Sequence, residues 1–313
     1  YLERNDFAGK YKYVDDGIFG GLAAAKPSIF PIYWSRPQME ARQDTSMVAV
    51  RGFLNSFWRH ESEGRVWFDP TRDTAYPDRV RRREPGTSSG GLSPHTDSGS
   101  IERWLLPAYQ KVFRHVFDGN PGAYDPWDGA YRTEVHEFES TVMCSAFRTF
   151  QGWTALSDMA ADQGVLHSVP IPEAIAYLLL RPLLGDVPDE DMCGVTVSRS
   201  FPVTERWHSL LLGGVSGIPD VQAGDSVWWH GDMVHNVAPV IDQKGWGNVM
   251  YIPAAPWCPR NERYTATVLQ ALRTGSSPDD FPEEHYERSW QNRFNVDDLN
   301  EYGRRAVGLA VSS

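Results

Sequence analysis

The feature that most constrains this fold is a pair of segments far apart in the chain. Ser93–Ser98 reads SPHTDS, and Gly224–Val240 reads GDSVWWHGDMVHNVAPV. Alternate residues of an extended strand point to one face, so His95 and Asp97 would project into the same cavity. The second segment is typical of strand, tight turn and strand, which predicts a β-hairpin that carries His235. We expect the fold to bring these two segments together.

Two imidazoles and one carboxylate on one side of a metal ion leave its other positions open, as in non-haem Fe(II) oxygenases. We therefore interpret His95, Asp97 and His235 as candidate catalytic and metal-binding residues. A bare His-x-Asp pattern occurs by chance in many chains. The strand-turn-strand pattern around His235 is what favours a metal site over a chance match.

His230 competes with His235 for the third position, because both lie in the predicted hairpin. His230 ends the first strand, whereas His235 lies beyond the turn in the alternating run Val-His-Asn-Val. We favour His235 as the ligand. We expect His230 either near the rim of the site or in a supporting hydrogen bond.

Composition narrows the class of protein. A hydrophobic fraction of 41% in 313 residues is typical of a folded globular chain, and a formal net charge of −11 argues against general binding to nucleic acid or anionic membranes. No apolar run approaches the length of a membrane span. Three cysteines without paired spacing and no visible signal peptide indicate a reducing, cytoplasmic location, although the sequence starts at Tyr1 rather than Met.

Many short predicted strands with turn residues between them, flanked by helices, predict a mainly β fold with a jelly-roll core. We expect residues 1–313 to form a single domain, since no long polar linker divides them. Within it we expect an N-terminal helical scaffold at 1–65, a core at 66–256 with an insertion around 101–140, and a C-terminal helical extension at 257–313.

An arginine-rich segment precedes the first ligand segment, in Tyr76–Pro85. If it is extended, alternation places Arg79, Arg81 and Arg83 on one side, where one or two of them could face a pocket. A solvated charged surface is the alternative interpretation.

Several longer segments resemble the DUF1479 (YbiU-like) family of the Fe(II)/2-oxoglutarate-dependent dioxygenase superfamily. They run from Pro31 to Asn261 and read PIYWSRPQMEAR, SPHTDSGSIERW, FQGWTALSD, GDSVWWHGDMVH and GNVMYIPAAPWCPRN. The resemblance implies a double-stranded β-helix, the cupin-like jelly roll. It also implies Fe(II) held by His95, Asp97 and His235, with 2-oxoglutarate as co-substrate and O2 as oxidant.

The far carboxylate of 2-oxoglutarate needs a cation, ideally a bidentate arginine. Many superfamily members place that arginine on the strand after the distal histidine, but here 247–251 reads GNVMY. We take Arg148 as the first candidate, because an arginine on a predicted core strand needs a partner. Lys244 and Asn248 are further candidates for binding the co-substrate. Other arginines also stay open at this point, namely Arg83, Arg103 and Arg260.

The function that these patterns favour is an Fe(II)/2-oxoglutarate-dependent dioxygenase. It would hydroxylate or otherwise oxidise a small-molecule metabolite, with an anionic one favoured by the arginines, and release succinate and CO2. A cupin-like Zn(II) or Mn(II) hydrolase or isomerase would use the same ligands. A non-catalytic metal-binding jelly-roll protein is the third alternative. We expect neither a nucleic-acid partner nor a membrane, and we leave the oligomeric state open.

Overall fold

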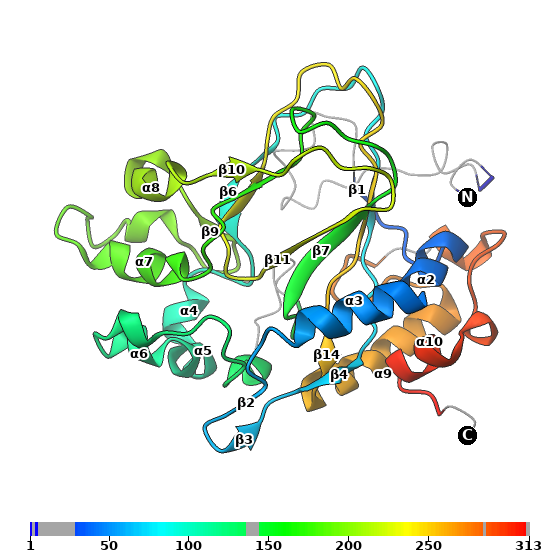
Figure 1. The fold of residues 1–313 in the computed structure, drawn as a ribbon, viewed down its shortest axis with the longest axis horizontal. Helices are drawn as coiled ribbons and strands as arrows, with labels where there is room; N and C mark the ends of the chain where they lie inside the picture. The colour runs from blue at the N-terminus through cyan, green and yellow to red at the C-terminus, as the bar shows by residue number, and fades with distance from the viewer. Residues whose placement is uncertain (2–3, 6–28, 136–143, 284–285, 311–313) are drawn as a thin grey trace.

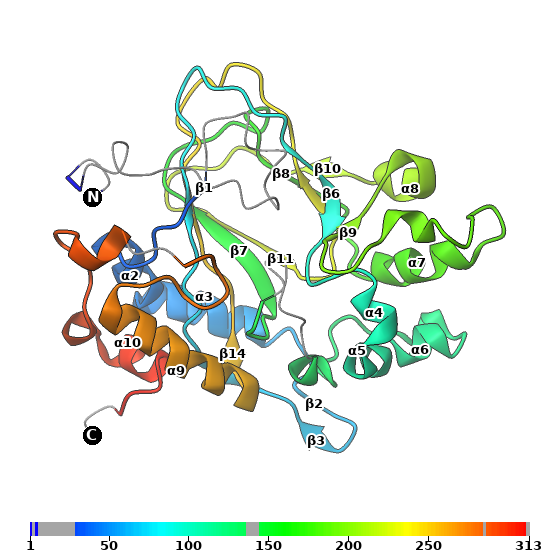
Figure 2. The same ribbon diagram turned by 180° about the vertical axis from the view of Figure 1, so that it is seen from behind.

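The computed structural model describes residues 1, 4–5, 29–135, 144–283 and 286–310. Parts of the predicted N-terminal scaffold and of the predicted insertion lie outside these ranges. The described chain is a mixed α/β structure, in which antiparallel sheets occupy the middle and helices gather on two flanks (Figures 1 and 2).

Two five-stranded sheets form the middle of the molecule. The strand order of the first sheet is β1 (Ile29–Phe30), β5 (Val80–Arg81), β13 (Val249–Tyr251), β7 (Phe150–Ala155) and β11 (Ser226–His230). The order of the second sheet is β10 (Ser216–Gly217), β8 (Leu166–Ser168), β12 (His235–Val237), β6 (Leu92–Thr96) and β9 (Phe201–Pro202). Two further pairs are β14 (Pro256–Trp257) with β4 (Asp69–Asp73) and β2 (Glu61–Ser62) with β3 (Arg65–Val66).

The two larger sheets face one another across an apolar core. One core cluster joins Trp153 of β7, Trp229 of β11 and Val249 of β13 with Leu166 of β8 in the second sheet. Burial of large apolar side chains is the main favourable term in folding, so this cluster holds the two sheets together.

The predicted hairpin is wrong. β11 pairs with β7 in the first sheet, whereas β12 pairs with β6 and β8 in the second. The turn at Gly231 and Asp232 therefore carries the chain from one sheet to the other. A turn pattern in the sequence shows where a strand ends, but the pairing partner of the next strand is set by burial of distant segments.

The helices account for much of the structure, so the mainly β expectation is corrected to a mixed fold. The longest helix has 16 residues, and no described strand exceeds six. One flank contains α2 (Arg36–Arg42), α3 (Thr45–Asn55), α9 (Pro259–Thr274) and α10 (Glu301–Ala306) (Figure 1). The other flank contains α4 (Glu102–Leu105), α5 (Pro107–Val112), α6 (Arg114–Phe117), α7 (Ala174–Leu180) and α8 (Glu205–Leu212). Short 3-10 turns are η1 (Pro121–Ala123), η2 (Arg132–Glu134), η3 (Arg181–Leu183), η4 (Met192–Gly194), η5 (Tyr286–Ser289) and η6 (Val296–Asp298).

Local sequence explains where several helices begin and end. Ser35 caps α2 by accepting a hydrogen bond from the backbone N–H of Gln38, and Pro37 occupies its first turn. α9 starts at Pro259 and ends at Gly275, whose φ of +70° favours glycine. Pro107 separates α4 from α5, because it lacks the N–H that a continuous helix needs there.

The predicted segment boundaries do not coincide with separate structural units. β1, from the predicted N-terminal scaffold, pairs with β5 and so belongs to the first sheet. The single-domain organisation and its boundaries stay a prediction. Within the described ranges, every helix is too short or too polar to cross a membrane.

Candidate metal centre

Two neighbouring strands of the second sheet bring the three predicted ligands together. β6 carries His95 near its end, Asp97 follows directly, and β12 begins at His235. His95 and His235 are partners in the antiparallel register, and their ring centroids are 4.4 Å apart. The cluster therefore depends on two features, the two-residue spacing of His95 and Asp97 and the cross-strand pair of His95 with His235.

Each histidine ring is oriented by a nearby backbone carbonyl. Nδ1 of His95 donates to the carbonyl of Ser93 at 2.7 Å, and Nδ1 of His235 donates to that of Met233 at 3.0 Å. Because a carbonyl only accepts, Nδ1 of each ring carries a proton, and Nε2 is the nitrogen that can bind a metal ion once it has given up any proton of its own. Both Nε2 atoms face the carboxylate of Asp97, at 3.4 Å and 3.5 Å.

The charges in the cluster are set by this geometry. Burial acts to raise the pKa of Asp97, but the hydrogen bonds and charges of His235 and His95 outweigh it and hold the pKa well below its usual value. Burial acts to lower the pKa of His95, but Asp97 and the Ser93 carbonyl together raise it. Asp97 is therefore ionised at neutral pH, as a metal-binding carboxylate must be.

The opposite sheet supports the cluster through Gln151 of β7. Its Nε2 donates to Oδ2 of Asp97 at 2.9 Å, and the ring of Trp229 of β11 lies 5.3 Å from that of His235. Such contacts orient metal ligands and tune their affinity. Gln151 was not among the predicted site residues, since its only signal in the sequence is a polar residue within a predicted core strand.

The three side chains fit a transition-metal ion. One ligand atom from each lies within 4.8 Å of the others, and no second group of three such side chains occurs in the described chain. The side chain of Asp97 is 30% exposed, whereas those of His95 and His235 are 11% and 6% exposed. Two nitrogens and one oxygen suit Fe(II) or Zn(II) and leave positions open for other ligands.

A buried ionic network ties the two ligand segments to each other. Arg103 of α4 is 1% exposed, and it donates to the backbone carbonyl of Asp97 at 2.7 Å and to Asp232 at 3.0 Å. Asp232 lies in the turn before β12 and also contacts Arg132 at 2.9 Å and the Tyr124 hydroxyl at 3.1 Å. Burial acts to raise the pKa of Asp232, but the two arginines hold it below its usual value. The network fixes the end of β6 against the start of β12.

His230 makes supporting hydrogen bonds, which was the second of the two roles predicted for it. Its Nε2 donates to the carbonyl of Pro126 at 3.0 Å, and its Nδ1 accepts from the N–H of Asp232 at 2.9 Å. The ring stacks on Trp58 with centroids 4.6 Å apart. Burial lowers its pKa to about 4, so it is neutral at physiological pH.

Arg148 was predicted to lie on a core strand, but it precedes β7 by two residues and lies outside any strand, at the triad end of β7. Its guanidinium lies over the ring of Tyr76 at 5.3 Å. Burial opposes the charge, but Cys144, Tyr76 and Asp97 together raise the pKa of Arg148. No carboxylate in the described ranges forms an ion pair with it, and its role in binding the co-substrate stays a prediction.

Asn248 and Lys244 lie toward the other end of the strands. The carbonyl of Asn248 accepts a hydrogen bond from Leu156, which is five residues beyond Gln151, or about 16 Å at 3.3 Å per strand residue. The side chain of Lys244 is exposed, and the backbone N–H of Lys244 donates to Oε1 of Gln163 at 2.7 Å. The structure does not bring either residue to the triad, and their co-substrate role stays a prediction.

The other candidate arginines differ in their partners. Arg103 belongs to the buried network described above. Arg260 donates to the backbone carbonyls of Ser145, at 2.6 Å, and Cys144, at 2.9 Å. Arg83 lies with Arg81 near Gly247 and Gly164, well away from the triad.

Comparison with known proteins adds relatives that cover nearly the whole chain. The uncharacterized protein YbiU of Escherichia coli (strain K12) is 58% identical over 99% of this chain and 74% of its own length. A crystal structure named "Putative Oxidoreductase from Salmonella typhimurium LT2" is 56% identical, with a TM-score of 0.94, over 99% of this chain and 75% of that one.

A more distant solved structure is GlcNAc Inducible Gene 2, GIG2 (DUF1479), from Candida albicans. It is 28% identical, with a TM-score of 0.77, over 99% of this chain and 72% of that one. The Gig2-like family model matches residues 1–309. The chain therefore belongs to the Gig2-like (DUF1479) family, as the segments quoted from its sequence predicted.

Proposed function

We propose that this protein is an Fe(II)/2-oxoglutarate-dependent dioxygenase that oxidises a small, anionic metabolite. The observation that carries the proposal is the cluster of His95, Asp97 and His235, which offers three converging ligand atoms and opens on one side. The name of the Salmonella relative agrees with an oxidoreductase.

The strand order supports a jelly-roll core of the kind used by this superfamily. Eight strands can be counted in chain order as β5, β6, β7, β8, β10, β11, β12 and β13. If these eight strands are numbered one to eight along the chain, their order is 1-8-3-6 across the first sheet and 5-4-7-2 across the second. The chain thus alternates between facing antiparallel sheets, as in a double-sheet jelly roll.

The residues of this chain would position and protect the reacting groups. When bound, Fe(II) with 2-oxoglutarate and O2 would supply the oxidising chemistry. The Nδ1 hydrogen bonds of His95 and His235 keep both Nε2 lone pairs aimed at the ion, and Gln151 holds the carboxylate of Asp97. The ring of Trp229 packs beside that of His235, with centroids 5.3 Å apart, and would help to hold its orientation.

Arg148 is the proposed partner for the far carboxylate of 2-oxoglutarate. It has no ion pair within the described ranges, and it lies close enough to Asp97 for their charges to interact. A forked guanidinium matches a carboxylate with two parallel hydrogen bonds. We therefore expect Arg148→Met to weaken binding of 2-oxoglutarate more than binding of the metal.

Metal exchange tests the proposal against its main rival, a Zn(II) or Mn(II) hydrolase or isomerase. Protein stripped of metal is reloaded with Fe(II), Zn(II) or Mn(II), and succinate is measured with 2-oxoglutarate, O2 and a panel of small carboxylates and phosphates. We expect succinate from the Fe(II) form alone. Conversion of a panel compound by the Zn(II) form without consumption of 2-oxoglutarate would establish the rival.

A further inference from the structure

Two arginines of one strand are buried side by side away from the metal centre. β5 pairs with β13, and the pairing continues beyond the strand, since the N–H of Gly247 donates to the carbonyl of Arg83 at 3.0 Å. Arg81 and Arg83 are 5% and 8% exposed, whereas Arg82 between them turns outward and pairs with Glu84 at 2.6 Å. The alternation predicted for this segment therefore directs both guanidiniums inward.

Within the described ranges, the recorded partners of both buried guanidiniums are backbone carbonyls or sulfur rather than carboxylates. Nε of Arg81 donates to the carbonyl of Gly247 at 3.4 Å, and Nη1 of Arg83 donates to that of Gly164 at 2.9 Å. No aspartate or glutamate of the described ranges forms an ion pair with either arginine. Burial lowers the pKa of both, and burial together with the charge of Arg81 lowers the pKa of Arg83 to about 10. Two adjacent buried charges of one sign are unfavourable without a counter-ion.

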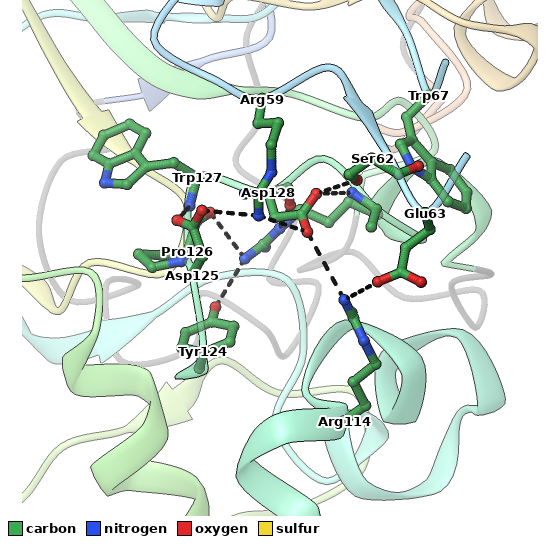
Figure 3. A network of polar contacts seen from close by, with 12 residues as sticks. Arg59, Ser62, Glu63, Trp67, Arg114, Tyr124, Asp125, Pro126, Trp127 and Asp128 are labelled. Carbon is green, nitrogen blue, oxygen red and sulfur yellow. Dashed lines mark hydrogen bonds and ion pairs between the residues drawn. The ribbon is translucent and has the colours of Figure 1, made fainter. Parts of the chain in front are cut away.

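Arginines elsewhere in the molecule show the usual arrangement. A surface cavity of about 390 Å³ is lined by Arg59, Asp125 and Asp128 among others. Arg59 contacts both carboxylates there, each at 3.0 Å (Figure 3). Arg114 in the same cavity contacts Glu63 at 2.6 Å. The basic groups of that cavity are thus neutralised by the chain itself, whereas no carboxylate of the described residues pairs with Arg81 or Arg83.

The surroundings of the two arginines are shaped to admit their side chains. A Cβ added at Gly164 would lie 2.5 Å from Nη1 of Arg83, so a larger residue there would displace the guanidinium. A Cβ added at Gly247 would lie 3.3 Å from Arg83 and 3.6 Å from the amide carbon of Gln243. Gln243 is 2% exposed, and its Oε1 has no partner. Reversal of that amide would present an N–H at the same place.

We propose that Arg81 and Arg83, with Gln243, form a binding site for an oxyanion, either a carboxylate or a phosphate group of a small metabolite. Arginine forks and an amide N–H are the donors that such groups require. The site lies between the sheets, because Arg81 belongs to the first sheet and Gly164 leads into β8 of the second.

Both sheets give the same separation between this oxyanion site and the metal centre. Arg81 is level with Val249 and Ala155, and Ala155 is four residues from Gln151 along β7. On the other sheet Gly164 is four residues from Ser168, the partner of His235. Four strand residues correspond to about 13 Å. The bound group is therefore either the far end of a ligand that reaches the metal or part of a separate effector.

The test uses metal-free protein, so that it does not depend on the proposed dioxygenase activity. Thermal unfolding is measured with inorganic phosphate and with succinate, a dicarboxylate that lacks the keto group needed to chelate a metal. The variants are Arg81→Met and Arg83→Met. Arg82→Met is the matched control, because it removes the same charge from the same strand at an outward-facing, ion-paired position.

We expect at least one anion to raise the Tm of the natural protein and of Arg82→Met, and to bind about tenfold or more weakly to Arg81→Met. Without added anion, Arg81→Met should melt at the same or a higher temperature than the natural protein, because an unpaired buried charge has been removed. If this variant does not fold, Arg81→Lys keeps the charge but loses the forked donors, and its binding should also weaken.

The choice of anion identifies the source of the group. A preference for succinate would indicate a metabolite that carries a carboxylate, and a preference for phosphate would indicate a phosphorylated metabolite. The proposal is overturned if neither anion stabilises the natural protein, or if Arg81→Met and Arg82→Met respond equally. A failure of the dioxygenase proposal alone would leave these anion effects unchanged.

Discussion

Asp97 and Asp232 are carboxylates held between two basic side chains, and their differences separate a reactive site from a structural one. Asp97 faces His95 and His235, at 3.4 Å and 3.5 Å, and its side chain is 30% exposed. Asp232 faces Arg103 and Arg132, at 3.0 Å and 2.9 Å, and its side chain is 4% exposed. Arginine cannot give up its proton in a protein, whereas neutral histidine keeps a lone pair. The first arrangement can take up a cation, and the second is already neutralised.

The two carboxylates are also connected. Arg103 donates to Asp232 and to the backbone carbonyl of Asp97. The closed network therefore positions the open cluster, and the comparison predicts different consequences when each carboxylate is removed.

The largest effect is expected for Asp97→Ala. Loss of the one anionic ligand should abolish metal binding and turnover coupled to 2-oxoglutarate, while the fold is retained, because the network around Asp232 is unchanged. Metal content and succinate release measure the loss, and circular dichroism checks the fold. Full coupled activity in this variant would show that the triad is not the metal site.

Asp232→Ala should act on stability instead. It leaves Arg103 and Arg132 buried without their carboxylate, which costs about 3–5 kcal/mol of unfolding free energy. Urea denaturation measures the change. Glu301→Ala is the control, because it removes the carboxylate of an exposed pair with Arg305 and should change stability little. Similar losses in both variants would contradict a special role for the buried network.

His230 makes the network sensitive to acid. Its pKa is lowered from 6.5 to about 4, so between these values the unfolded chain binds more protons than the folded one. Stability should therefore fall as the pH drops from about 6.5 to 4, by about 3 kcal/mol for this group at 1.36 kcal/mol per unit. Urea denaturation at several pH values should show a shallower slope for His230→Gln, and an unchanged slope would contradict the buried neutral histidine.

The smallest effect is expected for Gln151→Leu. This variant removes the hydrogen bond to Asp97 but no ligand, so metal affinity should fall about 10–100-fold while the stability of the metal-free protein changes little. Calorimetric titration with a divalent metal measures the affinity. Unaltered affinity would show that Asp97 is positioned by Arg103 and the two histidines alone.

Local spacing allowed part of this structure to be predicted. The two-residue step from His95 to Asp97 and the alternation of Arg81 with Arg83 both follow from the geometry of one strand. Such features depend on neighbours in the sequence, which a single chain displays directly.

Long-range pairing was harder to predict. The pattern around Gly231 indicated a hairpin, but the turn connects two sheets. Asp232 in this turn forms buried ion pairs with Arg103 and Arg132, which come from distant segments of the chain. Asn248 and Lys244 were chosen from their order after His235, and the structure places them at the other end of the strands. Sequence order shows neither which strand becomes the partner nor which end of it lies near the site.

An anaerobic titration tests the central claim most directly. Metal-free protein receives Fe(II) and then 2-oxoglutarate, and visible absorption is recorded. We predict a new metal-to-ligand charge-transfer band that is lost in His95→Ala and retained in Gln151→Leu at saturating metal. Tight binding of Fe(II) without any band on addition of 2-oxoglutarate would contradict the dioxygenase assignment and favour a hydrolase or isomerase at the same three residues.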